Sequence, residues 1–112
     1  MSFKFKVNDN TTLDDARNFL DELRKANVKE LYLNDIRKVL TFLGVTEIGL
    51  TGGSAIRFKH ESLIGQKYHL DGIFIIHIIH KGGNQQIVTK NDFKNYMYDP
   101  LVLIIELLKN KK

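Results

Sequence analysis

The 112-residue chain has no cysteine, no tryptophan, one proline and no long uninterrupted apolar run. The absence of cysteine excludes a disulfide framework, a thiolate zinc site and a thiol nucleophile, and it agrees with a cytoplasmic protein. The longest apolar stretches are interrupted by His77, His80 or Glu106, well short of the roughly 20 residues of a membrane span. The first residues also lack the apolar run of a signal peptide. We therefore expect a cytoplasmic chain without a membrane partner.

The composition that remains is that of an ordinary globular domain, with 43% apolar and 27% charged residues. A chain of this length can bury a core without disulfides or metals, so we expect residues 1–112 to form a single domain.

The net charge of +4 arises in one part of the chain. Basic and acidic residues cancel over residues 1–50, whereas residues 51–112 contain nine basic and five acidic side chains. A local basic excess fits a nucleic-acid or acidic-protein partner. A solvated surface with slightly more lysine explains the charge equally well.

Two helices are predicted in the first half of the chain. Thr12 is a good N-cap, and Asp14 and Asp15 follow it in the first turn, where the helix dipole favours negative charge. A second apolar stripe runs from Leu33 to Leu43, and Gly44 is a natural helix end. Before these helices, residues 3–7 alternate as a short strand or an extended arm would.

A third helical region is predicted from Asn91 onward. Asp99 and Pro100 interrupt it and predict either a new helix or a kink. The segment from Leu101 to Leu108 has Glu106 as its one polar residue, so it is either part of the core or a docking surface, for example of a homo-oligomer.

The middle of the chain is predicted to form strands, at residues 46–50, 54–60 and 73–80. Gly52-Gly53 and Asp71-Gly72 are hairpin signals, and a looser connection is expected over residues 62–66. The run from Ile73 is apolar on both faces, as in a central strand or one covered by a partner. The order predicts an α+β domain, with a three-stranded antiparallel sheet and helices packed on one face.

Alternation along the second strand separates two sets of side chains. Ile56, Phe58 and His60 share one face, and Arg57 and Lys59 lie on the other with Ala55. A basic row on an open sheet face can hold a phosphate backbone. Two solvated basic residues are the plainer explanation.

The histidines do not form a metal site by spacing. His77 and His80 are three residues apart, and a strand sends them to opposite faces, so shared metal ligation is not expected. His77 alternates with Ile75 and Ile79, which predicts a buried, hydrogen-bonded histidine. His80 ends the strand and is expected to be exposed. The glycines match no phosphate-binding or dinucleotide motif, so the sequence predicts no cofactor.

Two short motifs resemble those of the HicA toxins, which are small bacterial mRNA interferases inhibited by a HicB antitoxin. Residues 53–60, Gly-Ser-Ala-Ile-Arg-Phe-Lys-His, are similar to the family's Gly-Ser-His followed by an aromatic-basic-His strand. Residues 77–84, His-Ile-Ile-His-Lys-Gly-Gly-Asn, are similar to its strand-end His and Gly-Asn. The likeness covers residues 31–112 and implies a double-stranded-RNA-binding-like α-β-β-β-α core, to which residues 1–30 would be an extension.

The chain departs from the family at one important position. The residue after Gly-Ser is the family's catalytic histidine, and here it is Ala55. An imidazole there would act as acid or base toward the ribose 2′-hydroxyl, which a methyl group cannot do. The chain is then an inactivated toxin, a relative that binds RNA without cutting it, or a nuclease that uses His80 or His60.

Two functions therefore remain open. The first is a HicA-like endoribonuclease, or an inactive form of one, with a HicB-like antitoxin as partner; Ser54, Arg57, Lys59 and Lys81 would bind RNA. The second is a non-catalytic interaction protein, such as a phage or mobile-element inhibitor or a homodimeric binding protein. Whether the chain is an enzyme is not decided by the sequence.

Overall fold

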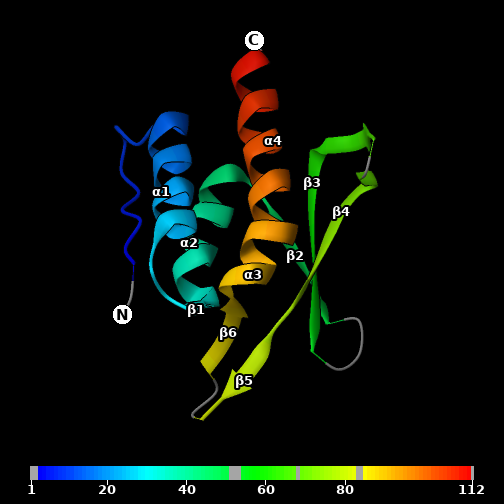
Figure 1. The fold of residues 1–112 in the computed structure, drawn as a ribbon. Helices are drawn as coiled ribbons and strands as arrows, with labels where there is room; N and C mark the ends of the chain where they lie inside the picture. The colour runs from blue at the N-terminus through cyan, green and yellow to red at the C-terminus, as the bar shows by residue number, and fades with distance from the viewer. Residues whose placement is uncertain (1–2, 51–53, 68, 83–84, 112) are drawn as a thin grey trace.

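Two small antiparallel sheets and three helical segments make up the α+β fold of the computed structural model, which describes residues 3–50, 54–67, 69–82 and 85–111 (Figure 1). The helical segments are α1 (Leu13–Lys25), α2 (Leu33–Leu43) and a C-terminal run of α3 (Lys90–Asp92), η1 (Phe93–Met97) and α4 (Tyr98–Asn110). One sheet has the order β2 (Thr46–Leu50), β3 (Ala55–Gln66), β4 (His69–His77). The other has the order β1 (Glu30–Tyr32), β6 (Gln85–Thr89), β5 (Ile79–Lys81).

The first two helices begin and end where the sequence predicts. The Thr12 side chain accepts a hydrogen bond from the Asp15 amide, and the Asp15 carboxylate accepts one from the Thr12 amide, which completes a capping box for α1. Helix α2 ends at Gly44, whose φ of 82° is the left-handed conformation that glycine adopts without strain.

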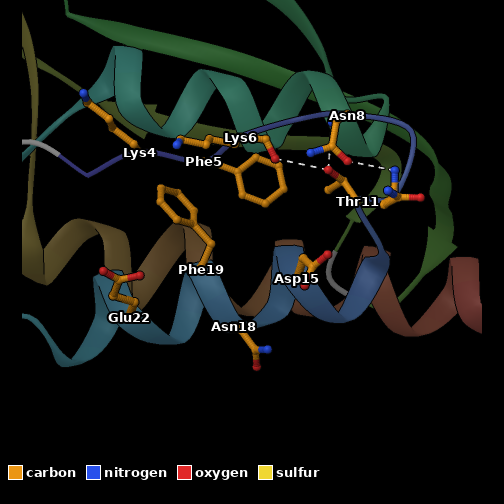
Figure 2. A pocket seen from close by; sticks show the side chains of 10 residues that line it. Lys4, Phe5, Lys6, Asn8, Thr11, Asp15, Asn18, Phe19 and Glu22 are labelled. Carbon is orange, nitrogen blue, oxygen red and sulfur yellow. Dashed lines mark hydrogen bonds between the residues drawn. The ribbon is translucent and has the colours of Figure 1, made fainter.

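The N-terminal residues form an extended arm along α1 and no strand. The Phe5 ring is buried, with its centre 5.2 Å from that of Phe19 and 5.5 Å from that of Phe42. Figure 2 shows the arm over α1, with the Thr11 hydroxyl bonded to the Lys6 carbonyl and to the Asn8 amide. A hollow of about 400 Å³ lies beside it. The arm and α1 therefore belong to the same core as the rest of the chain.

The C-terminal helical run passes Pro100 without ending. Proline has no amide hydrogen, and its ring collides with the carbonyl four residues before it in a regular α-helix. One wide turn precedes it, in which the Tyr98 amide bonds to the Phe93 carbonyl five residues back. Leu101, Ile104 and Ile105 of α4 are fully buried within the chain, so these side chains form core and are not available to a second copy.

Helices lie on one side of the β2–β3–β4 sheet, as expected, with α4 against β3 (Figure 1). The β1–β6–β5 sheet was not expected, and it divides the predicted strand 73–80 into β4 and β5 at Ile78. The prediction of a central strand is also wrong, because β4 lies at the end of its sheet. The expected turn at Gly52-Gly53 lies outside the described residues, as do Gly83 and Asn84 of the second motif.

A register shift between β3 and β4 corrects two further predictions. Residues 62–66 are not a loose connection but belong to β3, and Asp71-Gly72 lies inside β4. Near the hairpin Ile64 pairs with Asp71, and the next pair along the ladder is Lys59 with Ile73, so four residues of β3 lie opposite Gly72 alone. Gly72 has φ 75°, and a Cβ atom there would be 2.8 Å from the His60 carbonyl oxygen. Only glycine fits this bulge without displacement.

Candidate functional site

The side of the β2–β3–β4 sheet that faces away from the helices is the candidate site, and we call it the outer face. It comprises six residues of the two long strands: Ala55, Arg57, Lys59, Ile73, Ile75 and His77. The inner face alternates with it and packs into the core through Ile56, Phe58 and Ile76. The expected basic row therefore lies on the face opposite the core. Among the described residues, the helices lie on the inner side of the sheet (Figure 1), but at the β4 edge of the outer face Ile73 and Ile75 line a hollow of about 400 Å³ together with residues of η1 and α4.

Arg57 occupies the middle of the outer face. Its neighbours across the two ladders are Ile75 on β4 and Gly49 on β2. The Nε atom is buried and has no hydrogen-bond partner among the described residues. A guanidinium donor without a partner is costly, and a phosphate or carboxylate is the ligand that its donors match best. Lys59, one pleat further along β3, is exposed and opposite Ile73.

Ala55 and His77 are direct partners in the β3–β4 ladder. The Ala55 side chain is 7% exposed, whereas the His77 side chain is exposed to solvent. The prediction that His77 is buried is therefore wrong. Ser54, at the start of β3, is exposed, and its carbonyl accepts a hydrogen bond of 2.7 Å from the Ile78 amide. This bond holds the end of β4 against the start of β3.

His60 lies on the other side of the sheet and is buried. Its Nε2 is 2.8 Å from the Leu43 carbonyl oxygen, so this nitrogen donates to one of the last carbonyls of α2. Its Nδ1 accepts from the Ser62 amide at 3.1 Å and lies 2.7 Å from the Ser62 hydroxyl oxygen. Both ring nitrogens are therefore engaged, and the ring links β3 to the end of α2.

His80 and Lys81 belong to β5, in the other sheet. Both are exposed, and the Lys81 ammonium forms an ion pair of 2.9 Å with Glu30 of β1. The structure thus brings Ala55, Arg57 and Lys59 together on one face, with Ser54 directly before them in the chain, and separates them from the remaining candidates, His60, His80 and Lys81. In their place it adds His77 to the site.

Charged groups also meet on the helical side, between α1 and α4. The Tyr98 hydroxyl donates a hydrogen bond to the Asp21 carboxylate, and Arg17 lies 3.4 Å from the same carboxylate oxygen. The bond from Tyr98, with a smaller contribution from Arg17, holds the pKa of Asp21 below its usual value, against the opposing effect of burial. These groups connect two helices and do not reach the outer face.

Among the described residues, no three His, Asp or Glu side chains are grouped so that they could hold a metal ion. No helix in the described part of the chain is long and apolar enough to cross a membrane. No protein-family model, curated protein or solved structure matches the chain.

Proposed function

We propose that the chain is a HicA-like RNA-binding protein of a toxin–antitoxin system, and that the outer face is its RNA surface. It is either an endoribonuclease or an inactive relative of one. A HicB-like antitoxin is the protein partner that this proposal implies, and the chemistry needs no cofactor.

The order of elements supports the proposal. Helix α2, the three antiparallel strands β2, β3 and β4, and the C-terminal helical run occur in the α-β-β-β-α order of a double-stranded-RNA-binding-like core, with β5 and β6 inserted between β4 and the last helical run. The helices lie on one side of the sheet, so the other side is available to a ligand (Figure 1). The arm, α1 and the β1–β6–β5 sheet are elements added to this α-β-β-β-α arrangement.

The observation that carries the proposal is the position of Arg57 on the outer face. This guanidinium lies in the middle of the outer face, between Lys59 and the Ala55–His77 pair. Cationic side chains on such a face attract and position a phosphate backbone.

Removal of the basic row tests the proposal. We expect the double substitution Arg57→Ala with Lys59→Ala to weaken RNA binding about tenfold, a loss of about 1.4 kcal/mol. Binding is measured by fluorescence anisotropy with a labelled RNA stem-loop over a series of salt concentrations. The double variant should also have a shallower dependence of log Kd on log salt, because it neutralises fewer phosphates.

The matched control is Lys38→Ala with Lys94→Ala. These lysines are exposed on α2 and η1, on the helical side of the chain, and their removal lowers the net charge by the same amount. If the two double variants bind RNA equally well, the outer face is not the RNA surface.

A second candidate function, a non-catalytic protein-interaction module, is favoured by exposed isoleucines. Ile75 on the outer face is 49% exposed, and Ile48 of β2 is 41% exposed. Apolar side chains beside a half-buried arginine suit a protein interface as well as a nucleic-acid surface. An apolar interface should resist added salt, whereas phosphate binding should weaken steeply, so the salt series separates the two functions.

A further inference from the structure

We propose that His77 is the catalytic base of RNA cleavage in this chain. It would replace the histidine that the HicA toxins have at the position of Ala55. The inference rests on the proposed function and adds to it a residue to which neither motif assigns a catalytic role. Its basis is the pairing of His77 with Ala55 across the β3–β4 ladder.

The ladder places the His77 ring beside the position that Ala55 occupies. Side chains directly opposite in an antiparallel pair have Cβ atoms about 5 Å apart and point to the same face. The Ala55 methyl is covered by its surroundings, whereas the His77 side chain extends into solvent. At this end of the sheet, His77 is therefore the imidazole among the described residues that a bound RNA can reach.

The ring of His77 is not held by other side chains. It has no hydrogen-bond or ion-pair partner among the described residues, in contrast to the ring of His60. Its neighbours on the outer face are Ile75 on the same strand and Arg57 diagonally across the ladder. An arginine that is the diagonal neighbour of an imidazole can bind a phosphate while the imidazole contacts the ribose attached to that phosphate.

The reaction follows from these two groups. His77 takes the proton of a ribose 2′-hydroxyl as its oxygen forms a bond to the adjacent phosphorus, and Arg57 stabilises the negative charge that develops on the phosphoryl oxygens. The bond from phosphorus to the 5′ oxygen breaks, and that oxygen takes a proton from water. The imidazolium then returns its proton to the hydroxide that remains. The products are a 2′,3′-cyclic phosphate and a 5′-hydroxyl end.

The test uses the full chain and a labelled RNA stem-loop with single-stranded flanks. Binding is measured by anisotropy, and cleavage by gel electrophoresis with mass identification of the new ends. We expect His77→Gln to slow cleavage at least about 100-fold, the lower end of the usual contribution of a general base, with Kd changed less than about threefold. Glutamine keeps a polar side chain of similar reach at this exposed position.

Two controls identify the chemistry. His80→Gln removes the exposed imidazole of β5 and should leave the cleavage rate within about twofold. A strand of the same sequence made with deoxyribose should bind but remain intact, because it has no 2′-hydroxyl to act as the nucleophile. Thermal melting followed by circular dichroism should be the same for both variants and the parent chain.

The outcomes separate the inference from the function on which it rests. RNA that is bound but not cut by the parent chain overturns the role of His77 and leaves RNA binding standing. Cleavage that persists in His77→Gln also overturns it and assigns catalysis to another residue. If the parent chain binds RNA no more tightly than the double variant Arg57→Ala with Lys59→Ala, the proposed function itself is overturned.

Discussion

The two faces of the β2–β3–β4 sheet are built from the same strands and have opposite properties. The inner face is entirely apolar in its middle, with Phe58 and Phe74 stacked at 5.4 Å and closed against the helices. The outer face alternates with it residue by residue and has the half-buried Arg57 beside the exposed Lys59 and His77. The difference separates two roles. Stability comes from the inner face, and the outer face is left for recognition, so substitutions on the two sides should differ in kind.

The largest effect is expected from a charge placed behind the inner face. Ile104 of α4 is fully buried, so Ile104→Asp would leave a carboxylate without a partner in apolar surroundings. We expect a loss of more than about 4 kcal/mol of unfolding free energy, a large part of the about 5–15 kcal/mol that stabilises a typical domain, and therefore a partly or fully unfolded chain. Circular dichroism measures this. Asn95→Asp, at an exposed position of η1, is the control and should stay folded.

Neighbouring residues of β3 compare the faces directly. Phe58→Ala removes a buried ring and should cost about 3–5 kcal/mol. Arg57→Ala, one residue earlier on the same strand, should cost less than about 1 kcal/mol, through the packing of its aliphatic stem. Urea denaturation of both variants gives the two values. Equal costs would mean that the outer face also stabilises the fold.

The bulge that positions the two faces is tested at Gly72. Gly72→Ala combines a positive φ with a contact of 2.8 Å to the His60 carbonyl oxygen, so we expect a loss of about 2–3 kcal/mol. Gly65→Ala has a φ of 83° and open space around the new methyl group. It should lose only the conformational part, about 1 kcal/mol. If the two losses, measured by denaturant unfolding, are the same, the close approach at Gly72 has no energetic weight.

The smallest effect concerns the polar contact between α1 and α4. Because the folded-state pKa of Asp21 is lowered, its contribution is present above its unfolded pKa near 3.8 and is lost as pH falls through the folded value. Tyr98→Phe removes the main cause, so it should cost about 1 kcal/mol at pH 7 and less at pH 3. Unfolding free energies at the two pH values measure this.

Tyr96→Phe is the matched control for that substitution, since Tyr96 is exposed on η1. It should have no effect at either pH. A cost of Tyr98→Phe that is the same at pH 3 and pH 7 would contradict the assignment to the Asp21 carboxylate.

The inner face and both early helices were predictable because they depend on local signals. The Thr12 cap, the stripe from Leu33 to Leu43 and the alternation from Ile56 to His60 are visible in the sequence and confirmed by the structure. Short strands such as β1 have three residues, too few for a period to show. Their existence depends on pairing with a distant partner, here β6.

The position of His77 could not be predicted for a related reason. Continuing the hairpin register without a shift would place His77 opposite Phe58, on the buried face. The bulge moves the pairing by three residues, and an odd shift exchanges the two faces, so His77 meets Ala55 instead. The signal that exists is Gly72, a glycine inside a strand, which is typical of a bulge but does not give its size. His60 was placed on the correct face, but its bond to the Leu43 carbonyl depends on tertiary packing.

The pairing of β1 with β6 has a consequence for the order in which the chain folds. It joins residues that are 55 to 59 positions apart, whereas the β3–β4 hairpin joins Gln66 to His69. The entropy lost on closing a loop grows with its length, and distant pairings are slow to form. We therefore expect the β2–β3–β4 meander to be assembled first, with the β1–β6–β5 sheet closing in a late kinetic step. A nascent chain would then present its outer face before the last strands have left the ribosome.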